Sequence, residues 1–263
     1  MIDGFPAWAP YSAHSGEGFN PESFAKLAEL EAGNFWFRAR NELIIWALRR
    51  YFMPARSLLE IGCGTGYVLT GVAAAFPQVR LVGSEIFIAG LAQAKSRVPD
   101  ASLIQMDARH IPYRGEFDVA IAADVLEHIE EDEQVLSQLF KALRPGGGAI
   151  ITVPQHPWMW SGADDYACHV RRYTSSEIRR KIVAAGFAVE LSTSFVSLLL
   201  PLMAASRILN HRASQPNPHA EFNIPRPVNS LLEQVLRSER AAISIGLRFP
   251  FGGSRFVVAR KAT

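Results

Sequence analysis

The stretch SLLEIGCGTGYVL, residues 57–69, joins an apolar run, three glycines at alternate positions and the start of a helical pattern. Such a loop lies where a strand ends and a helix begins, which is where open α/β sheets bind their ligands. Glycine lets the backbone turn tightly and approach a ligand without a Cβ atom in the way. The stretch therefore predicts a cofactor site, and the spacing of its glycines narrows the choice of cofactor.

The spacing argues against the two commonest nucleotide-binding loops. A dinucleotide fingerprint, G-x-G-x-x-G, would need glycine where Tyr67 stands. A triphosphate-binding loop would need a Lys followed by Ser or Thr, and none follows. A dinucleotide remains compatible with one feature, the acidic Glu85 at the end of the next predicted strand, since such domains place an acid there.

Short apolar runs alternate with helical patterns along the rest of the chain. Strands are predicted at 57–61, 80–84, 102–105, 117–122, 149–153, 187–193 and 255–259. Helices are predicted at 67–76, 88–97, 132–143 and 175–185, the last with Thr174 and Glu177 as a capping box. This alternation predicts a mostly parallel sheet with helices on both faces.

Two further regions flank or interrupt that pattern. Residues 1–53 are predicted to form a helical cover, with a helix over 21–52 that breaks at Gly33-Asn34, and residues 54–263 the main domain. A helical insertion is expected at about 195–253, with a Pro/Asn/His loop at 210–227. Its apolar run, 195–209, is shorter than the roughly 20 residues that a membrane-spanning helix needs. We predict no transmembrane segment, while contact with a membrane surface stays open for this run.

Composition is that of a globular protein, with 49% hydrophobic and 20% charged residues and a net charge of +2. The charge is uneven, because residues 1–165 hold 13 Lys and Arg against 20 Asp and Glu, and the remainder is basic. This asymmetry fits either an anionic partner or two halves that neutralise each other. The start of the chain lacks a signal-peptide pattern, and Cys63 and Cys168 lack metal-ligand spacing. We expect a cytoplasmic protein without disulfides.

The sequence LEIGCGTGYVL resembles motif I of the class I S-adenosylmethionine-dependent methyltransferases. The family's later motifs follow in order over about residues 57–155, as VRLVGSE, IQMDA, FDVAIAADVLEHI and LRPGGGAIITVP. The resemblance implies a Rossmann-like α/β fold, with a seven-stranded, mostly parallel sheet, an antiparallel last strand, an N-terminal helical cover and a helical insertion before the final strand.

The resemblance also implies how S-adenosylmethionine is held and S-adenosylhomocysteine is left as product. Glu85 would bind the ribose hydroxyls, Asp107 the adenine amino group, and Arg38 or Arg40 the methionine carboxylate. The other implied cofactor residues are Glu60, Gly62, Cys63, Gly64, Thr65, Gly66, Ile86, Met106, Ala108 and Asp124. The sulfonium methyl is already activated, so a general base is needed only when the acceptor is protonated at neutral pH.

The segment DVLEH, residues 124–128, follows the fourth predicted strand. In some quinone-pathway O-methyltransferases E-x-x-E-H coordinates a divalent metal, and Asp124, Glu127 and His128 have that spacing, with aspartate in the first place. The alternative is that Glu127 and His128 buttress the next helix. We predict no resident metal, and we keep His128 as a candidate catalytic residue.

The stretch VPQHPWMWSGADDYACHVRRYTSSEI, residues 153–178, leaves the fifth predicted strand at the usual edge of the acceptor pocket. It resembles the D-x-x-x-x-H-x-R-R-Y segment of a group of bacterial methyltransferases, with Asp164 or Asp165 as its acid. The candidate substrate contacts are Trp36, His156, Trp160, Tyr166, Arg171, Arg172 and Tyr173, and the candidate base is His169. The alternative is a loop held together by an Asp–Arg pair and a buried tyrosine.

Together these features predict an S-adenosylmethionine-dependent methyltransferase that acts on a small or lipid-like, possibly anionic acceptor, with O-methylation favoured. One alternative is a non-catalytic, regulatory S-adenosylmethionine-binding domain. A nucleic-acid methyltransferase is the other, and the missing N/D-P-P-Y/F motif after the fourth strand argues against it. We therefore expect no nucleic-acid partner.

Overall fold

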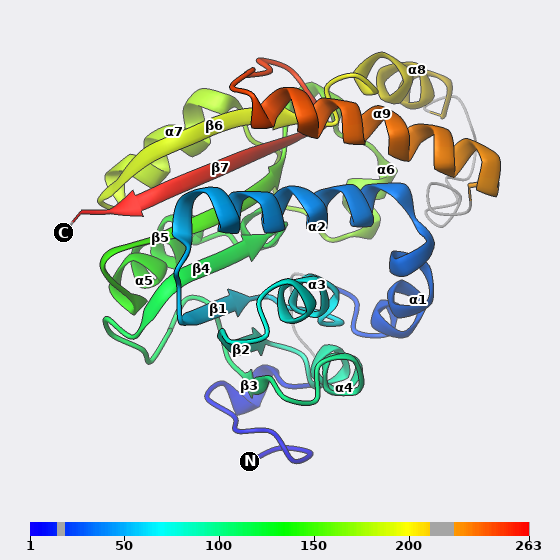
Figure 1. Ribbon diagram of the computed structural model, residues 1–263. Helices are drawn as coiled ribbons and strands as arrows, with labels where there is room; N and C mark the ends of the chain where they lie inside the picture. Colours follow the sequence, from blue (N-terminus) through cyan, green and yellow to red (C-terminus); the bar gives the residue numbers. More distant parts are fainter. Residues whose placement is uncertain (15–18, 211–223, 263) are drawn as a thin grey trace.

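The computed structural model describes residues 1–14, 19–210 and 224–262, and it contains one seven-stranded sheet in the order β3-β2-β1-β4-β5-β7-β6 (Figure 1). The strands are β1 Ser57–Ile61, β2 Arg80–Glu85, β3 Ser102–Gln105, β4 Phe117–Ala123, β5 Leu143–Pro154, β6 Phe187–Phe195 and β7 Ser254–Lys261. Strands β1 to β5 are parallel, and β7 runs antiparallel between β5 and β6. The predicted fold class is confirmed.

The helices follow the predicted alternation. The main ones are α1 Ser23–Leu30, α2 Phe35–Ala47, α3 Tyr67–Ala75, α4 Ile88–Arg97, α5 Asp132–Ala142, α6 Gly162–Tyr166, α7 Ser175–Ala184, α8 Leu200–Asn210 and α9 Arg226–Ser244. Short turns of 3-10 helix lie at Pro10–Ser12, Glu31–Gly33, Leu126–His128 and Pro157–Met159, and a π-helical turn, Leu48–Phe52, extends α2. The predicted break between α1 and α2 is present, since Asn34 is extended and its side chain caps α2 through Trp36 N.

The strands at the centre of the sheet are buried on both faces, as the apolar runs predict. Neighbouring residues alternate between the faces, so that Leu58 packs in one cluster and Leu59 in the other. Helices α2, α3, α4 and α9 contribute to the first cluster, and α5 and α7 to the second. The sheet is thus the middle layer of three.

Helix α9, from the predicted insertion, packs along α2 (Figure 1). Asn229 accepts a hydrogen bond from Phe35 N at 2.8 Å and donates one to Gly33 O at 3.0 Å, so the insertion holds the start of α2. Most of the predicted Pro/Asn/His loop lies outside the described residues. Within the described ranges, no helix has the length and apolar character needed to cross a bilayer.

Candidate functional site

The glycine loop connects β1 to α3 in a conformation that requires its glycines. Gly62 and Gly66 have φ of +58° and +77°, in the left-handed region that residues with a Cβ disfavour. A Cβ atom on Gly62 would lie 2.6 Å from a methyl group of Val125, and one on Gly66 would lie 3.0 Å from Ala94 Cα. The loop therefore packs directly against the β4 loop and α4, with no space for larger residues.

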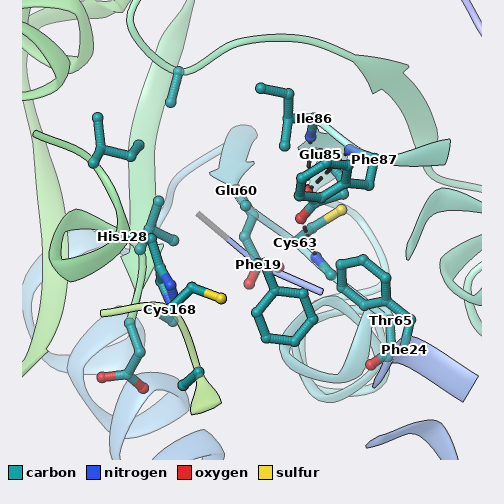
Figure 2. A pocket seen from close by; sticks show the side chains of 18 of the residues that line it. Phe19, Phe24, Glu60, Cys63, Thr65, Glu85, Ile86, Phe87, His128 and Cys168 are labelled. Carbon is teal, nitrogen blue, oxygen red and sulfur yellow. Dashed lines mark hydrogen bonds between the residues drawn. The ribbon is translucent and has the colours of Figure 1, made fainter. Parts of the chain in front are cut away.

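A cavity of about 850 Å³ opens beyond this loop, at the carboxyl ends of β1, β2 and β4 (Figure 2). Most of the predicted site residues line it, namely Trp36, Arg40, Glu60, Gly62, Cys63, Gly64, Thr65, Glu85, Ile86, Met106, Asp107, Ala108, Asp124, His128 and His169. They come from segments up to 133 positions apart (residues 36 and 169), and the fold brings them to one site. Gly66 does not line the cavity and supports the loop from behind.

Glu85 is fixed at the end of β2 by backbone hydrogen bonds. One carboxylate oxygen accepts from Ile86 N at 2.8 Å and Phe87 N at 3.2 Å, and the other accepts from Gly64 N at 3.1 Å. Burial raises the pKa of Glu85, and these hydrogen bonds oppose the rise in part. These three contacts leave about one of the four acceptor positions of the carboxylate for a ligand hydroxyl group.

Asp107 is held by Arg109, two residues later. The guanidinium donates to both carboxylate oxygens, from Nη2 to Oδ2 at 2.8 Å and from Nε to Oδ1 at 3.1 Å. Arg109 also pairs with Glu131. Burial alone would raise the pKa of Asp107, but the hydrogen bonds from Arg109 outweigh it and lower the pKa. Arg109 N also donates to Oδ1 at 2.8 Å, so the three donors of Arg109 leave about one of the four acceptor positions of the carboxylate for an amino donor.

Glu60 is 2% exposed, and one of its carboxylate oxygens has no hydrogen-bond partner within the described residues. Burial raises its pKa well above the usual value, while the nearby Arg40 acts in the opposite direction. Glu31 also faces the cavity, where it accepts hydrogen bonds from Thr65 Oγ1 and Arg97, both at 2.6 Å. A buried carboxylate with a free oxygen suits a cationic ligand.

The charge of the cavity lining distinguishes between cofactors. Within the described part of the lining the guanidinium groups are Arg40 and Arg109, no lysine is present, and each arginine already pairs with an acid. The carboxylates of Glu31, Glu60 and Glu85 would repel the pyrophosphate of a dinucleotide. The same groups would attract the ammonium and sulfonium charges of S-adenosylmethionine, so the residues present fit this cofactor.

Of the two candidate arginines on α2, only Arg40 faces the cavity. It forms an ion pair with Asp124, and its guanidinium lies 4.5 Å from the centre of the Trp36 ring. Arg38 instead pairs with Glu233 on α9 and does not line the cavity. The structure therefore leaves Arg40 as the candidate partner for the methionine carboxylate.

His128 and His169 lie together on the far side of the cavity from Glu85, where Figure 2 shows His128 beside Cys168. Their ring centres are 4.7 Å apart, and the rings meet edge to face. His169 Nδ1 lies 2.8 Å from Asp164 Oδ1, which also accepts from Arg172 Nε at 2.7 Å. Burial would raise the pKa of Asp164, but these partners outweigh it and lower the pKa to about 2.

Three residues predicted to touch the substrate lie outside the cavity. Tyr173 is fully buried, and its hydroxyl donates to Asp132 at 2.6 Å. Arg171 pairs with Asp132 at 2.8 Å, and Arg172 pairs with Asp164. Val170 N donates to Glu127 O, so this segment crosses the β4 loop, where Arg172 and Tyr173 are buried and Arg171 is partly exposed. Their contacts are those of the alternative, a loop held by an Asp–Arg pair and a buried tyrosine, and a substrate role for these three residues stays a prediction.

The aromatic candidates of the same segment also lie away from the cavity lining. His156 packs against Trp158 and Phe251, at ring-centre distances of 5.4 and 5.9 Å. Trp160 donates from its indole nitrogen to Asp165 at 2.9 Å. The hydroxyl of Tyr166 lies 3.5 Å from the hydroxyl of Ser23 and so links α6 to α1. Loop contacts occupy these side chains, so Trp36 alone of the aromatic substrate candidates borders the cavity.

The spacing-based metal set is not brought together. Asp124 turns to Arg40, whereas candidate ligand atoms of Glu127, His128 and His169 come within 4.8 Å of one another. This group differs from the one that the spacing predicts, because His169 takes the place of Asp124. Glu127 is fully buried and does not line the cavity. That the site uses no resident metal stays a prediction.

Sequence patterns missed Glu31, Phe19 and Phe24, which border the cavity from the α1 region. Glu31 lies in an ordinary amphipathic pattern, and only its contacts with Thr65 and Arg97 mark it as part of the site. No signal near residue 31 predicts those contacts, because they depend on how α1 folds back over the glycine loop.

Comparison with known proteins finds similarity to methyltransferases. A family described as methyltransferase domain matches residues 59–149. A probable S-adenosylmethionine-dependent methyltransferase of Mycolicibacterium smegmatis is 29% identical over 163 residues, which is 60% of this chain and 61% of that protein. A trans-aconitate 2-methyltransferase of Variovorax paradoxus is 33% identical over 41% of this chain and 43% of its own length.

Solved structures agree on the fold. The [4+2]-cyclase SpnF has a TM-score of 0.59 at 21% identity, over 87% of this chain and 84% of its own. A Haemonchus contortus phosphoethanolamine N-methyltransferase 2 in complex with S-adenosyl-L-methionine has a TM-score of 0.56 at 19% identity, over 85% of this chain and 53% of its own.

The sheet order and the position of the glycine loop are those of a Rossmann-like α/β fold, which the solved structures share. Residues 59–149 match a family described as methyltransferase domain, and the chain is similar to probable S-adenosylmethionine-dependent methyltransferases. The match spans 61% of the length of the mycobacterial relative.

Proposed function

We propose that the protein transfers a methyl group from S-adenosylmethionine to a hydroxyl oxygen of a small, uncharged acceptor. One observation carries the proposal: a single cavity joins carboxylates suited to a cationic cofactor with His128 on the opposite side (Figure 2), and the His169 ring lies beside His128. Glu60 and Glu85 provide the first set, and His128 and His169 the second. This arrangement suits the alignment of a methyl donor with an acceptor that has to lose a proton.

The chain contributes position, exclusion of water and a proton acceptor. When bound, S-adenosylmethionine supplies an activated methyl group, so alignment accounts for much of the catalysis. Phe19, Phe24 and Trp36 border the cavity and offer apolar surface that excludes water. A hydroxyl acceptor is protonated at neutral pH, and an imidazole has the pKa range needed to accept its proton.

The charges of the described lining support an acceptor without acidic groups. Arg40 and Arg109 are paired with acids, and Arg171 and Arg172 lie outside the cavity. A polycarboxylate of the kind named for the trans-aconitate methyltransferases would meet no unpaired guanidinium among these residues. Glu130 and Glu131 also line the cavity and would repel it. The proposed acceptor is therefore neutral, in contrast to the anionic acceptor that the sequence allowed.

Calorimetry and an acceptor panel test this proposal. We expect S-adenosylmethionine and S-adenosylhomocysteine to bind the full-length protein and NADH not to bind. A panel of matched phenols and benzoates, assayed for S-adenosylhomocysteine release, should yield turnover only with phenols. Binding of NADH without S-adenosylmethionine would refute the cofactor site. Cofactor binding with no turnover of any acceptor would favour the regulatory alternative, and preferential turnover of the benzoates would refute the neutral acceptor.

A further inference from the structure

The segment after β5 contains a fixed carboxylate–imidazole pair that the family match, which ends at residue 149, does not reach. We propose that Asp164 positions His169 as the general base that removes the acceptor's proton. This inference rests on the hydroxyl acceptor proposed above, and it assigns a positioning role to Asp164 and a catalytic role to His169.

Asp164 is 1% exposed and is held through both of its carboxylate oxygens. Oδ2 accepts from Ser161 N at 2.9 Å, which closes the capping box at the start of α6. Oδ1 lies 2.7 Å from Arg172 Nε and 2.8 Å from His169 Nδ1. The carboxylate thus cannot rotate away from the imidazole without breaking contacts on three sides.

The backbone fixes the other end of the pair. His169 N donates to Asp164 O at 2.9 Å, and Val170 N donates to Glu127 O at 2.8 Å. Cys168, just before the histidine, has φ of +57°, an uncommon value that turns the chain at this point. Strained residues of this kind are found at sites where a side chain must be aimed. Here the turn precedes His169, which borders the cavity together with its neighbours Ala167, Cys168 and Val170.

The hydrogen bond to Asp164 determines which ring nitrogen of His169 carries the proton. A carboxylate only accepts, so Nδ1 must carry the proton, and Nε2 is left with its lone pair. His169 borders the cavity, and we assign this lone pair to a ligand there. The same division of roles orients the base in carboxylate–histidine pairs of hydrolases.

Charged and polar groups surround the pair on several sides. Arg172, on the same carboxylate oxygen as His169, and Arg207, 3.8 Å from Oδ2, balance the negative charge of Asp164. His128 meets the ring edge to face, and the Glu127 carboxylate comes within 4.8 Å of both imidazoles. These groups place one potential negative charge, one imidazole and two guanidinium ions around the pair.

The proton and electrons balance without a further reactant. The acceptor O–H proton moves to His169 Nε2 as the oxygen lone pair forms a bond to the methyl carbon. The carbon–sulfur bond breaks with its electron pair left on sulfur, which loses its positive charge. The imidazolium then releases its proton to water when the products leave.

Acceptor acidity gives the sharpest test. His169→Ala and Asp164→Asn would be assayed with an ordinary phenol and with a nitro-substituted phenol that is ionised at the assay pH. We expect His169→Ala to lower kcat about 10²–10⁴-fold with the first acceptor and less than about tenfold with the second, since an ionised oxygen needs no base. Asp164→Asn should follow the same pattern with a smaller loss, and Asp164→Glu should recover part of it. His14→Ala is a matched control, because His14 is exposed and outside the cavity lining.

Two measurements keep the outcomes separable. Calorimetry should give the same S-adenosylmethionine affinity for the wild type and both variants. If the wild type does not bind S-adenosylmethionine, the proposed function is refuted, whereas the Asp164–His169 pair is not refuted by that result and is tested by nitrogen NMR. Nitrogen NMR of the wild type, which needs no acceptor, should show His169 protonated at Nδ1, with that preference lost in Asp164→Asn. An Nε2-protonated ring in the wild type, or an equal loss of kcat with both phenols, would overturn the inference.

Discussion

Glu85 Oε2 accepts a hydrogen bond from Gly64 N at 3.1 Å, and this contact ties the end of β2 to the glycine loop after β1. The two halves of the candidate cofactor site are therefore joined by a contact within the protein. The other oxygen of Glu85 is fixed by Ile86 N and Phe87 N, so the carboxylate has one orientation toward the cavity. A side chain held in this way loses little entropy when a ligand binds.

Glu85→Gln should weaken S-adenosylmethionine binding by about tenfold or more. The amide keeps the shape of the side chain, but it replaces one charged acceptor by a donor, and hydrogen bonds to charged groups contribute about 1.5–3 kcal/mol. Calorimetry would measure the change in Kd. Glu29→Gln, on the exposed surface of α1, is the matched control and should leave Kd unaltered. If Kd is unchanged in Glu85→Gln, the ribose hydroxyl groups of the cofactor do not bind Glu85.

The affinity for the cofactor should fall on acidification, and the fall should begin at a higher pH than the titration of ordinary exposed carboxyl groups. Burial raises the pKa of both Glu60 and Glu85, so these groups take up protons at a higher pH than exposed glutamates do. The neutral form no longer attracts the ammonium or sulfonium charge, and binding of the cation conversely favours proton release. Calorimetry from pH 8 to pH 5 should show Kd rising on acidification. Glu60→Gln should bind S-adenosylmethionine more weakly at pH 8, and its Kd should depend less on pH. If the pH dependence of Kd is the same as in the wild type, Glu60 does not interact with the cationic group.

Tyr173→Phe should reduce stability and spare cofactor binding. The hydroxyl is fully buried and bonds to Asp132 at 2.6 Å and to Leu126 O at 3.2 Å. Asp132 keeps Lys181 and Arg171 as partners, so the loss should be about 1–2 kcal/mol in the free energy of unfolding. Urea titration would measure this loss, and calorimetry should give an unaltered Kd. If the variant has normal stability and an altered KM for the acceptor, Tyr173 contacts the substrate.

The sequence was informative where local pattern and burial act together. The predicted strands at 57–61 and 102–105 coincide with β1 and β3, because apolar runs of that length are buried on both sides in a parallel sheet. Glu60 lies near the end of β1, Glu85 ends β2 and Asp107 follows β3, and these strand ends meet at one edge of the sheet. The cofactor half of the cavity could thus be proposed before the fold was known.

The acceptor side depended on contacts between distant segments. The D-x-x-x-x-H-x-R-R-Y pattern contains stacking and cationic groups, but it does not state which of them face inward. The backbone bond from Val170 N to Glu127 O decides this, and it leaves His169 at the cavity while Tyr173 enters the core. Glu31 was missed for the same reason, since its partner Thr65 lies 34 residues away.

The clearest contrast between pattern and contact lies on α2, where Arg38 and Arg40 are two residues apart and face different partners. Residues two apart on a helix point in directions about 200° apart, so one arginine reaches Glu233 on α9 and the other reaches Asp124 at the cavity. The matched pair Arg38→Ala and Arg40→Ala separates these roles. Arg40→Ala should weaken S-adenosylmethionine binding about tenfold or more, because it removes the candidate partner of the methionine carboxylate and leaves Asp124 without its guanidinium.

Arg38→Ala should leave the affinity within about twofold of wild type and lower stability by about 1 kcal/mol or less, as expected for a partly exposed ion pair between two helices. Calorimetry and urea unfolding of both variants would measure these effects. Charge alone is tested by Arg40→Lys, which keeps the cation but loses the flat guanidinium 4.5 Å from the Trp36 ring centre and should recover only part of the affinity. Equal losses of affinity for Arg38→Ala and Arg40→Ala would mean that α2 acts as a whole helix, and that neither arginine binds the cofactor directly.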